Sequence, residues 1–335
     1  MWMRWFPEMN SVEEDPPLVS VCMITYQHAF FIRQALDSVL MQEHSFPMEL
    51  CIGEDGSTDG TRDICQEYAS RYEGLVRLFV RDRGDAKRTT YAAPFMYNFV
   101  ETFKSCRGKY VALCEGDDYW SDPQKLQKQV NFLEAHPDYS MVFTAAKTLR
   151  GLTQQDWDPP PIVKNSYSLD DILERNFVCT PTVMFRNGVS DVLLEWLRKM
   201  QVGDWPLHIS NAMRGEFGYI NEPMAVYRVH DQGAWSRLGG VKRLEGAIAA
   251  SRMLMKLLPV EYKAALQRGI ELSQKQIVSF CLVWGNQPSV GRWHVFAILA
   301  KGRWPFERFS HALRATVWFF CPPLGRLLRK RSESS

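Results

Sequence analysis

Apolar runs alternate with amphipathic segments through the first 146 residues, and this alternation restricts the possible folds more than any other feature. Residues 18–26 read LVSVCMITY, an uninterrupted apolar run typical of a strand buried on both faces. Residues 30–42, FFIRQALDSVLMQ, repeat apolar residues at the spacing of a helix. The further expected strands are 49–53, 76–80, 109–114 and 139–146, with helices at 61–72, 95–106 and 123–136. This pattern predicts an α/β domain with an open, mostly parallel sheet and helices on both faces.

The composition argues against several classes of protein. The chain has 335 residues, of which 46% are hydrophobic, so it can bury a large core. Lysine and arginine number 40 against 38 aspartate and glutamate, and this balance argues against a nucleic-acid partner. The eight cysteines form no CxxC pair or zinc-ligand spacing, which favours reduced thiols in a cytoplasmic protein. We expect neither a signal peptide nor a membrane-spanning helix, because no apolar run reaches about 18 residues.

The strand and helix alternation ends near residue 146. The next stretch is rich in proline and polar side chains, which is typical of a surface loop. The expected elements are a loop or lid at 150–175, a strand pair or bent strand at 176–187, a helix at 189–200, strands interrupted by Pro223 at 218–229, and only helices after residue 240.

Three polar turns follow the expected strands. TYQH (25–28) follows the first strand, EDGSTDGT (54–61) the second and EGDD (115–118) the fourth. In open α/β sheets, ligands bind beyond the carboxyl ends of the strands. The three turns are therefore expected to share one site.

The acidic turn at 115–118 predicts a metal site. Crowded carboxylates repel one another and lose hydration when they are buried, so they need a compensating cation. Mg²⁺ and Mn²⁺ prefer oxygen ligands and commonly lie between carboxylates and substrate phosphates. The chain has neither GxGxxG after its first strand nor a P-loop, so metal is expected to hold a diphosphate. A solvated turn that only caps the next helix is the alternative.

Several segments together resemble the inverting glycosyltransferases of family 2, which have the GT-A fold. VSVCMITYQHAFFIRQALDSVLMQ, IGEDGSTDGTRDIC and GKYVALCEGDDYWSDPQKLQKQVNFLE resemble the nucleotide-sugar-binding half of that family, and GDWPLH with EPMAVYRVHDQGAWS resembles its acceptor half. The resemblance implies a Rossmann-like sheet and a division into four regions. These are an N-terminal arm (1–17), a nucleotide-sugar-binding half (18–146), an acceptor-binding and catalytic half (147–240) and a helical C-terminal extension (241–335).

The resemblance implies roles for residues in the three turns. The family's D-x-D motif corresponds to Glu115-Gly116-Asp117, and Asp117 is implied to bind the metal with the adjacent Asp118. Glu115 stands where the family usually has aspartate, and it is implied to contact either the ribose or the metal. The other residues implied to bind the nucleotide sugar are Thr25, Tyr26, Glu54 and Asp55, with Asp55 as the main contact to the base. For Thr25 and Tyr26, packing at a strand end is the alternative.

The acceptor half supplies the implied catalytic base, Asp204 in the segment GDW. An inverting transferase needs a base within hydrogen-bond reach of the attacking hydroxyl. The alternative is that Asp204 is the N-cap of the helix that follows it. The resemblance also implies that His230 binds the metal or a phosphate and that Arg228 pairs with the diphosphate. A solvated loop histidine is the alternative for His230.

The resemblance, together with these residues, implies an inverting glycosyltransferase of the hexosyltransferase type that depends on Mn²⁺ or Mg²⁺. The expected donor is a nucleotide-diphosphate sugar, with a UDP-sugar first in line, and the expected acceptor is a hydroxyl of a glycan or lipid-linked saccharide in surface polysaccharide biosynthesis. Two other classes stay open. One is a nucleotidyltransferase-like enzyme, and the other is a non-catalytic scaffold that binds sugar nucleotides.

The C-terminal extension is basic and aromatic. RLLRKR occupies residues 326–331, and tryptophan and phenylalanine alternate with arginine and lysine in the segments before it. This composition is typical of a segment that lies at a membrane surface, which would make the cytoplasmic chain peripheral at the inner face of the membrane. Packing within a core or between subunits explains the same aromatic residues.

Overall fold

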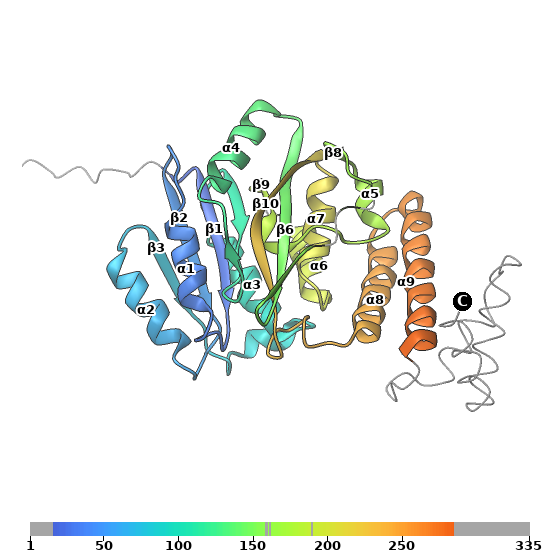
Figure 1. Ribbon diagram of the computed structural model, residues 1–335, viewed down its shortest axis with the longest axis horizontal. Helices are drawn as coiled ribbons and strands as arrows, with labels where there is room; N and C mark the ends of the chain where they lie inside the picture. Colours follow the sequence, from blue (N-terminus) through green and yellow to red (C-terminus); the bar gives the residue numbers. More distant parts are fainter. Residues whose placement is uncertain (1–15, 158–159, 161, 189, 285–335) are drawn as a thin grey trace, which may run out of the picture.

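The computed structural model describes residues 16–157, 160, 162–188 and 190–284 (Figure 1). Within these residues, one sheet of ten strands has the order β3-β2-β1-β4-β9-β6-β10-β5, with β7 paired to β6 and β8 paired to β10. The prediction of an α/β fold with a mostly parallel sheet is confirmed.

The first half of the chain supplies four adjacent strands at one side of the sheet and two more, β5 and β6, beyond β9. Its elements are β1 (Val19–Thr25), α1 (Ile32–Leu40), β2 (Met48–Glu54), α2 (Thr61–Arg71), β3 (Val76–Val80), the 3-10 helix η1 (Ala86–Thr90), α3 (Pro94–Lys104), β4 (Tyr110–Leu113), β5 (Tyr119–Trp120), α4 (Lys125–Ala135) and β6 (Tyr139–Arg150). Strands β3, β2, β1 and β4 pair in parallel with one another, as the alternation of strands and helices predicts.

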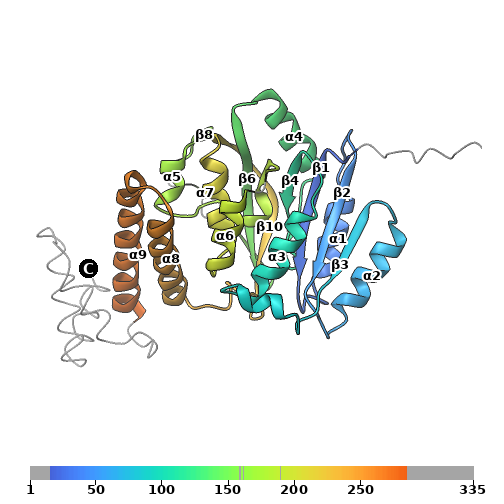
Figure 2. The same ribbon diagram turned by 180° about the vertical axis from the view of Figure 1, so that it is seen from behind.

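Helices cover both faces of the sheet because its central strands are apolar on both sides. Val21 and Met23 of β1 belong to a core shared with α1, α2 and α4, whereas Cys22 between them belongs to a core shared with α3 and with helices of the second half. Figures 1 and 2 show these two layers from opposite sides. The uninterrupted apolar pattern of β1 therefore reflects burial on both faces.

The second half of the chain extends the same sheet. Its elements are β7 (Thr153–Asp156), β8 (Ser166–Tyr167), α5 (Leu169–Leu173), the 3-10 helix η2 (Thr180–Thr182), β9 (Met184–Arg186), α6 (Asp191–Lys199), α7 (Asp204–Ala212), β10 (Glu216–Val229), α8 (Gly240–Leu257), the 3-10 helix η3 (Val260–Tyr262) and α9 (Lys263–Trp284). Strand β9 runs antiparallel between β4 and β6, so the last strand of the alternating series is not a neighbour of β4.

Three local predictions differ from the structure. The stretch 150–175 is not one irregular loop, since it contains β7, β8 and α5. The stretch 176–187 contains the single short strand β9 rather than a strand pair. Pro223 does not interrupt β10. The register of its pairing with β6 shifts on both sides of the proline, and such irregularities accommodate a residue that has no N–H to donate.

The described part of the C-terminal extension is helical, as expected. Helices α8 and α9 pack together through Val241, Ile248, Ile270 and Ile277. The helices expected after residue 284, and the basic run at 326–331, lie outside the described residues. Within the part of the chain that the structure describes, no helix is both long and apolar enough to cross a membrane.

The buried carboxylate of Glu49 links the strands of the first half near their amino ends, away from the acidic turn. Glu49 of β2 has a side chain that is only 1% exposed. It accepts hydrogen bonds from Ser20 Oγ (2.6 Å), Arg107 N (2.8 Å) and Arg77 Nη1 (2.9 Å). Burial by itself raises the pKa of a carboxyl group, but these hydrogen bonds outweigh it and hold the pKa of Glu49 below its usual value.

Glu49→Gln is expected to lower the free energy of unfolding at pH 7 by about 1.5–3 kcal/mol, because two arginines lose a charged acceptor. A lowered folded-state pKa stabilises the protein above the unfolded pKa, and this stabilisation is lost as the pH falls through the folded pKa. The difference between wild type and variant should therefore shrink as the pH falls below about 4. Urea unfolding at pH 7 and at acidic pH measures it, with the exposed Glu73→Gln as the control. An equal effect of both substitutions would contradict the structural role of Glu49.

Candidate active site

The three polar turns lie together at the carboxyl edge of the parallel strands. The backbone N–H of Asp55 donates to the carbonyl oxygen of Thr25 (3.0 Å), and that of Gly116 donates to Ile24 (2.9 Å). A Cβ on Gly116 would lie 2.5 Å from Thr25 Oγ1, so only glycine lets the acidic turn approach the end of β1 this closely. The expectation that the turns after β1, β2 and β4 share one site agrees with these contacts.

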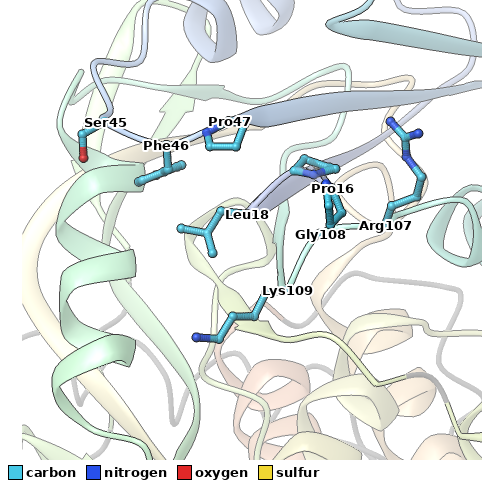
Figure 3. A pocket seen from close by; sticks show the side chains of 9 residues that line it. Pro16, Leu18, Ser45, Phe46, Pro47, Arg107, Gly108 and Lys109 are labelled. Atoms are coloured by element: carbon cyan, nitrogen blue, oxygen red, sulfur yellow. The ribbon is translucent and has the colours of Figure 1, made fainter. Parts of the chain in front are cut away.

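A hollow lies at the opposite end of the strands, and it lacks the chemistry expected of the site. Its volume is about 540 Å³ (Figure 3). Its lining residues are Pro16, Pro17, Leu18, Ser45, Phe46, Pro47, Arg107, Gly108 and Lys109. Leu18, Pro47 and Lys109 directly precede β1, β2 and β4, which places the hollow at the amino ends of these strands. No carboxylate lines it, so the acidic edge is the candidate active site.

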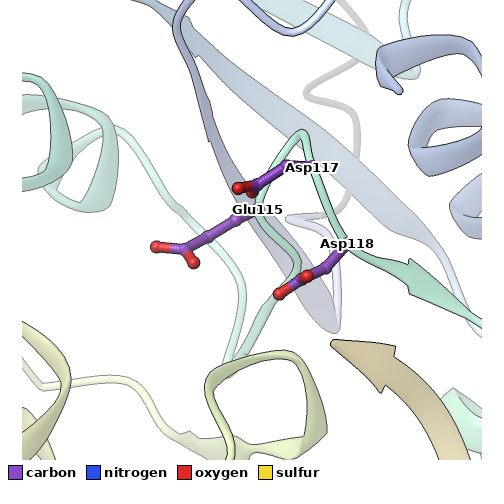
Figure 4. A group of neighbouring side chains, drawn as sticks. All are labelled: Glu115, Asp117 and Asp118. Atoms are coloured by element: carbon purple, nitrogen blue, oxygen red, sulfur yellow. The ribbon is translucent and has the colours of Figure 1, made fainter. Parts of the chain in front are cut away.

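Three carboxylates of the acidic turn are close enough to hold one cation. Glu115, Asp117 and Asp118 each offer an oxygen that lies within 4.8 Å of the others (Figure 4). Asp118 is fully buried; its Oδ1 accepts from the backbone N–H of Arg228 (2.8 Å), and its Oδ2 has no hydrogen-bond partner among the described residues. Burial raises the pKa of Asp118 well above its usual range, and burial with the charge of Asp117 raises that of Glu115 to about 8. The cluster thus fits a divalent cation, which would satisfy the unpaired oxygen and offset the repulsion.

Two histidines face the same carboxylate from other parts of the chain. His230 follows β10, and its Nε2 lies 3.0 Å from Asp117 Oδ2. His28 lies in the turn after β1, and its Nε2 is 3.7 Å from the same oxygen. Burial lowers the pKa of His28, whereas burial of Asp117 is outweighed by the two histidines, which hold its pKa below the usual value. The sequence reasoning selected the turn 25–28 but missed His28.

Arg228 supports the acidic turn through a hydrogen bond to its backbone. Its Nη1 donates to the carbonyl oxygen of Asp117 (2.6 Å), and its Nη2 donates to Gln34 Oε1. Its guanidinium carbon lies 5.2 Å from the ring centre of Phe31 and 4.6 Å from that of Tyr119. The guanidinium of Arg228, held by these contacts, therefore positions the backbone of Asp117. The expected contact of Arg228 with the diphosphate stays a prediction.

The residues expected to bind the nucleotide lie beside arginines. Asp55 pairs with Arg83 (3.1 Å) and with Arg88, which is itself buried. The guanidinium carbon of Arg83 lies 3.9 Å from the ring centre of Tyr26, so Tyr26 and Asp55 border the same group. Sequence reasoning missed both arginines, because Arg83 in the loop after β3 and Arg88 in the short 3-10 helix η1 lie outside the expected elements.

Glu54 has a different environment from Asp55, although the two are adjacent. Its side chain is fully buried, and it accepts from the backbone N–H of Ser57 (2.6 Å) and from Arg62 Nε (2.9 Å). These bonds fold the turn between β2 and α2. The geometry therefore places Glu54 in the support of the turn, and its contact with a base stays a prediction.

Asp204 lies at the start of α7 and close to the acidic turn. The N-cap of α7 is Gly203, so the structure does not place Asp204 at the N-cap position. Its Oδ1 accepts from the N–H of Trp205 (2.8 Å), and its Oδ2 accepts from Asn176 Nδ2 (2.8 Å). Burial raises the pKa of Asp204, and the charge of Asp204 contributes to the raised pKa of Glu115. The two halves of the chain therefore meet at this point.

Asn176→Ala should move the acid limb of the pH profile of kcat/KM upward if Asp204 is the base. The amide of Asn176 stabilises the carboxylate form of Asp204, so its loss raises the pKa of Asp204 further. A hydrogen bond to a charged group is worth about 1.5–3 kcal/mol, which corresponds to a shift of about one pH unit or more. Asn131→Ala on the exposed face of α4 is the control. An unchanged acid limb would show that Asn176 does not affect the pKa of the catalytic base.

The comparison with known families agrees with this geometry. Residues 20–193 match the model of Glycosyl transferase family 2, and the chain belongs to this family. An uncharacterized protein of Mycobacterium tuberculosis is 37% identical over 220 residues, which are 65% of this chain and 60% of that protein. The putative teichuronic acid biosynthesis glycosyltransferase TuaG of Bacillus subtilis is 30% identical over 64% of this chain and 79% of its own. The chain thus spans about 60% of the length of the mycobacterial relative.

Solved structures share the fold at low sequence identity. The structure of residues 1–349 of S. aureus TarS in complex with UDP-GlcNAc has a TM-score of 0.55 and 16% identity, and covers 90% of this chain and 80% of that one. The mannosyltransferase PcManGT of Pyrobaculum calidifontis, in complex with GDP-Man and Mn²⁺, has a TM-score of 0.52 and 18% identity, covering 92% of this chain and 88% of its own. Both likenesses confirm the GT-A fold.

Proposed function

We propose that this protein is a metal-dependent inverting glycosyltransferase that takes a sugar from a nucleotide-diphosphate sugar. The observation that carries the proposal is the cluster of Glu115, Asp117 and Asp118 at the carboxyl ends of the parallel strands, where one oxygen of each lies within 4.8 Å of the others. The proposal assigns the cation to this cluster and the base to Asp204 at the start of α7. Such a pair serves a displacement in which one group holds the leaving diphosphate and the other activates the acceptor.

The proposed reaction is a single displacement at the anomeric carbon. A bond forms between the acceptor oxygen and the anomeric carbon as the bond to the diphosphate oxygen breaks, and Asp204 takes the proton of the acceptor hydroxyl. Asn176 holds Oδ2 of Asp204, which orients the carboxylate. Asp117, Asp118 and His230 are the proposed ligands of Mn²⁺ or Mg²⁺, and the bound cation would stabilise negative charge on the departing diphosphate. Attack from the face opposite to the leaving group inverts the configuration.

The proposed donor is a UDP-sugar, bound by Thr25, Tyr26, Glu54 and Asp55. The likeness to TarS supports UDP, since that protein was solved with UDP-GlcNAc, whereas PcManGT was solved with GDP-Man. A thermal-shift screen of nucleotide sugars with Mn²⁺ or Mg²⁺ tests the proposal, because a ligand that binds only the folded chain stabilises it by RT ln(1 + [L]/Kd). Stabilisation by UDP-sugars is expected. A screen in which no nucleotide sugar stabilises the chain would count against the function.

The proposed acceptor is a glycan or lipid-linked saccharide used in surface polysaccharide biosynthesis. The similarity to TuaG, a putative glycosyltransferase of teichuronic acid biosynthesis, supports this acceptor class. Product assays with and without metal separate the proposal from its alternatives. A nucleotidyltransferase would release diphosphate rather than a nucleoside diphosphate, and a scaffold would turn over neither substrate.

A peripheral location at the inner face of the membrane is the last part of the proposal. It rests on the basic run at 326–331 and the aromatic segments before it. Full-length protein is expected to co-sediment with anionic vesicles at low salt and to be released at high salt, because surface attraction is screened. Protein that stays in the supernatant at low salt would leave packing as the explanation of these residues.

A further inference from the structure

The turn that carries His28 is held in an unusual backbone conformation. Gln27 has a φ of +56°, and it is the one non-glycine residue with positive φ among the described residues. Its N–H donates to Ser57 Oγ (3.0 Å), its Oε1 accepts from the N–H of Thr58 (2.7 Å), and the N–H of His28 donates to Thr61 Oγ1 (2.8 Å). A left-handed residue other than glycine costs energy and persists where the surrounding contacts enforce it. These contacts fix the direction of the His28 side chain.

The His28 ring has distinct partners at its two nitrogens. Nδ1 lies 3.2 Å from Thr25 Oγ1, within hydrogen-bond distance, and Nε2 lies 3.7 Å from Asp117 Oδ2, which is too long for a hydrogen bond. When Nδ1 carries the proton and donates it to Thr25, Nε2 presents a lone pair toward a carboxylate oxygen. A histidine that ligates a metal has this arrangement, with the proton on the other nitrogen held by a hydrogen bond.

The separations around Asp117 Oδ2 are close to those between ligands of one ion. Ligands about 2.1 Å from an octahedral ion are about 3.0 Å apart when adjacent and about 4.2 Å apart when opposite. Asp117 Oδ2 lies 3.0 Å from His230 Nε2, which is the adjacent separation, and 3.7 Å from His28 Nε2, which lies between the two values, so a small movement of the His28 side chain would bring it to either. The two imidazole rings lie edge to face with centres 6.1 Å apart.

We propose that His28 Nε2 is a ligand of the donor-site cation together with His230 Nε2 and Asp117, and that the two imidazoles make the site select Mn²⁺ over Mg²⁺. Mg²⁺ demands oxygen ligands and gives up water reluctantly, whereas first-row transition ions accept imidazole nitrogen. The inference rests on the proposed metal-dependent function and deepens it, because it adds His28 to the proposed ligands and names the ion.

The test is Mn²⁺ binding by the full-length protein, followed by electron paramagnetic resonance without any donor or acceptor. Pulsed spectra of bound Mn²⁺ are expected to show coupling to two imidazole nitrogens in the wild type. His28→Asn places an amide near the position of Nδ1, so it keeps the contact to Thr25 and removes Nε2. This variant is expected to show one imidazole coupling, to bind Mn²⁺ at least about tenfold more weakly, and to lose most of the preference over Mg²⁺ in competition.

Two controls make the outcome specific. His44→Asn changes a histidine whose Nδ1 contacts Phe46 O in the loop before β2, and it should leave the spectrum and affinity unchanged. His28→Gln places an amide nearer to Nε2, so it provides a second variant if His28→Asn is poorly folded. A single imidazole coupling in the wild type that persists in both His28 variants and disappears in His230→Gln would overturn the role of His28 while the proposed function stands. Absence of bound Mn²⁺ on the wild type would overturn the inference and the metal dependence together.

Discussion

Asp204→Asn is expected to transfer sugar at least about a hundredfold more slowly than the wild-type chain, while it binds nucleotide sugar and metal equally well. Loss of a general base typically costs 10²–10⁴-fold in the chemical step. The amide is nearly the same size as the carboxylate and can still accept from Trp205 N, so α7 should begin normally. Single-turnover kinetics measure the chemical step, and thermal unfolding measures the fold.

Asp191→Asn is the matched control for this substitution. Asp191 is also the first residue of its helix, α6, but it is exposed. Both variants lose a negative charge near the positive end of a helix dipole, an effect of about 0.3–1 kcal/mol on stability. Only Asp204→Asn should slow transfer. Destabilisation of Asp204→Asn with near-normal turnover of its folded fraction would assign the residue to the helix start, and the base would have to be sought elsewhere.

Asp117→Asn is expected to abolish the stabilisation that nucleotide sugar and metal together give to the folded chain. At a ligand concentration of 100 Kd this stabilisation is about 2.7 kcal/mol in the wild type, and it should be absent in the variant. The fold should survive, since the substitution also relieves repulsion with Glu115 and Asp118. Thermal shift with and without Mn²⁺ measures the effect.

Asp122→Asn is the control within the same acidic segment. Asp122 accepts from the N–H of Gln124 (2.8 Å) and from Lys128 Nζ (2.9 Å), so it supports the entry to α4 and does not belong to the cluster of three carboxylates. Its substitution should leave metal-dependent binding intact. Undiminished metal-dependent turnover of Asp117→Asn would remove this residue from the cation site.

Local patterns were sufficient to locate the acidic edge. The apolar runs of β1, β2 and β4 are encoded by consecutive residues, and a parallel sheet must bring their carboxyl ends to one edge. Glu115, Asp117 and Asp118 are neighbours in the chain, so their meeting needs no long-range information. For the same reason the sequence indicated the α/β fold.

The partners of those carboxylates were decided by the tertiary structure. His28 and His230 reach Asp117 from segments about 90 and 113 residues away in the chain, and Asn176 reaches Asp204 from the stretch before η2. The insertion of antiparallel β9 between β4 and β6 likewise has no local signal, because strand pairing depends on which apolar faces remain to be covered.

The sequence by itself therefore determined the alternating strands and helices that lead up to β6 and the place of the carboxylates, because hydrophobic period and turn residues act over a few positions. Only the tertiary structure decided which imidazole, guanidinium and amide groups face each carboxylate. Those contacts depend on the packing of distant segments, and they set the direction of each pKa shift through burial and nearby charge.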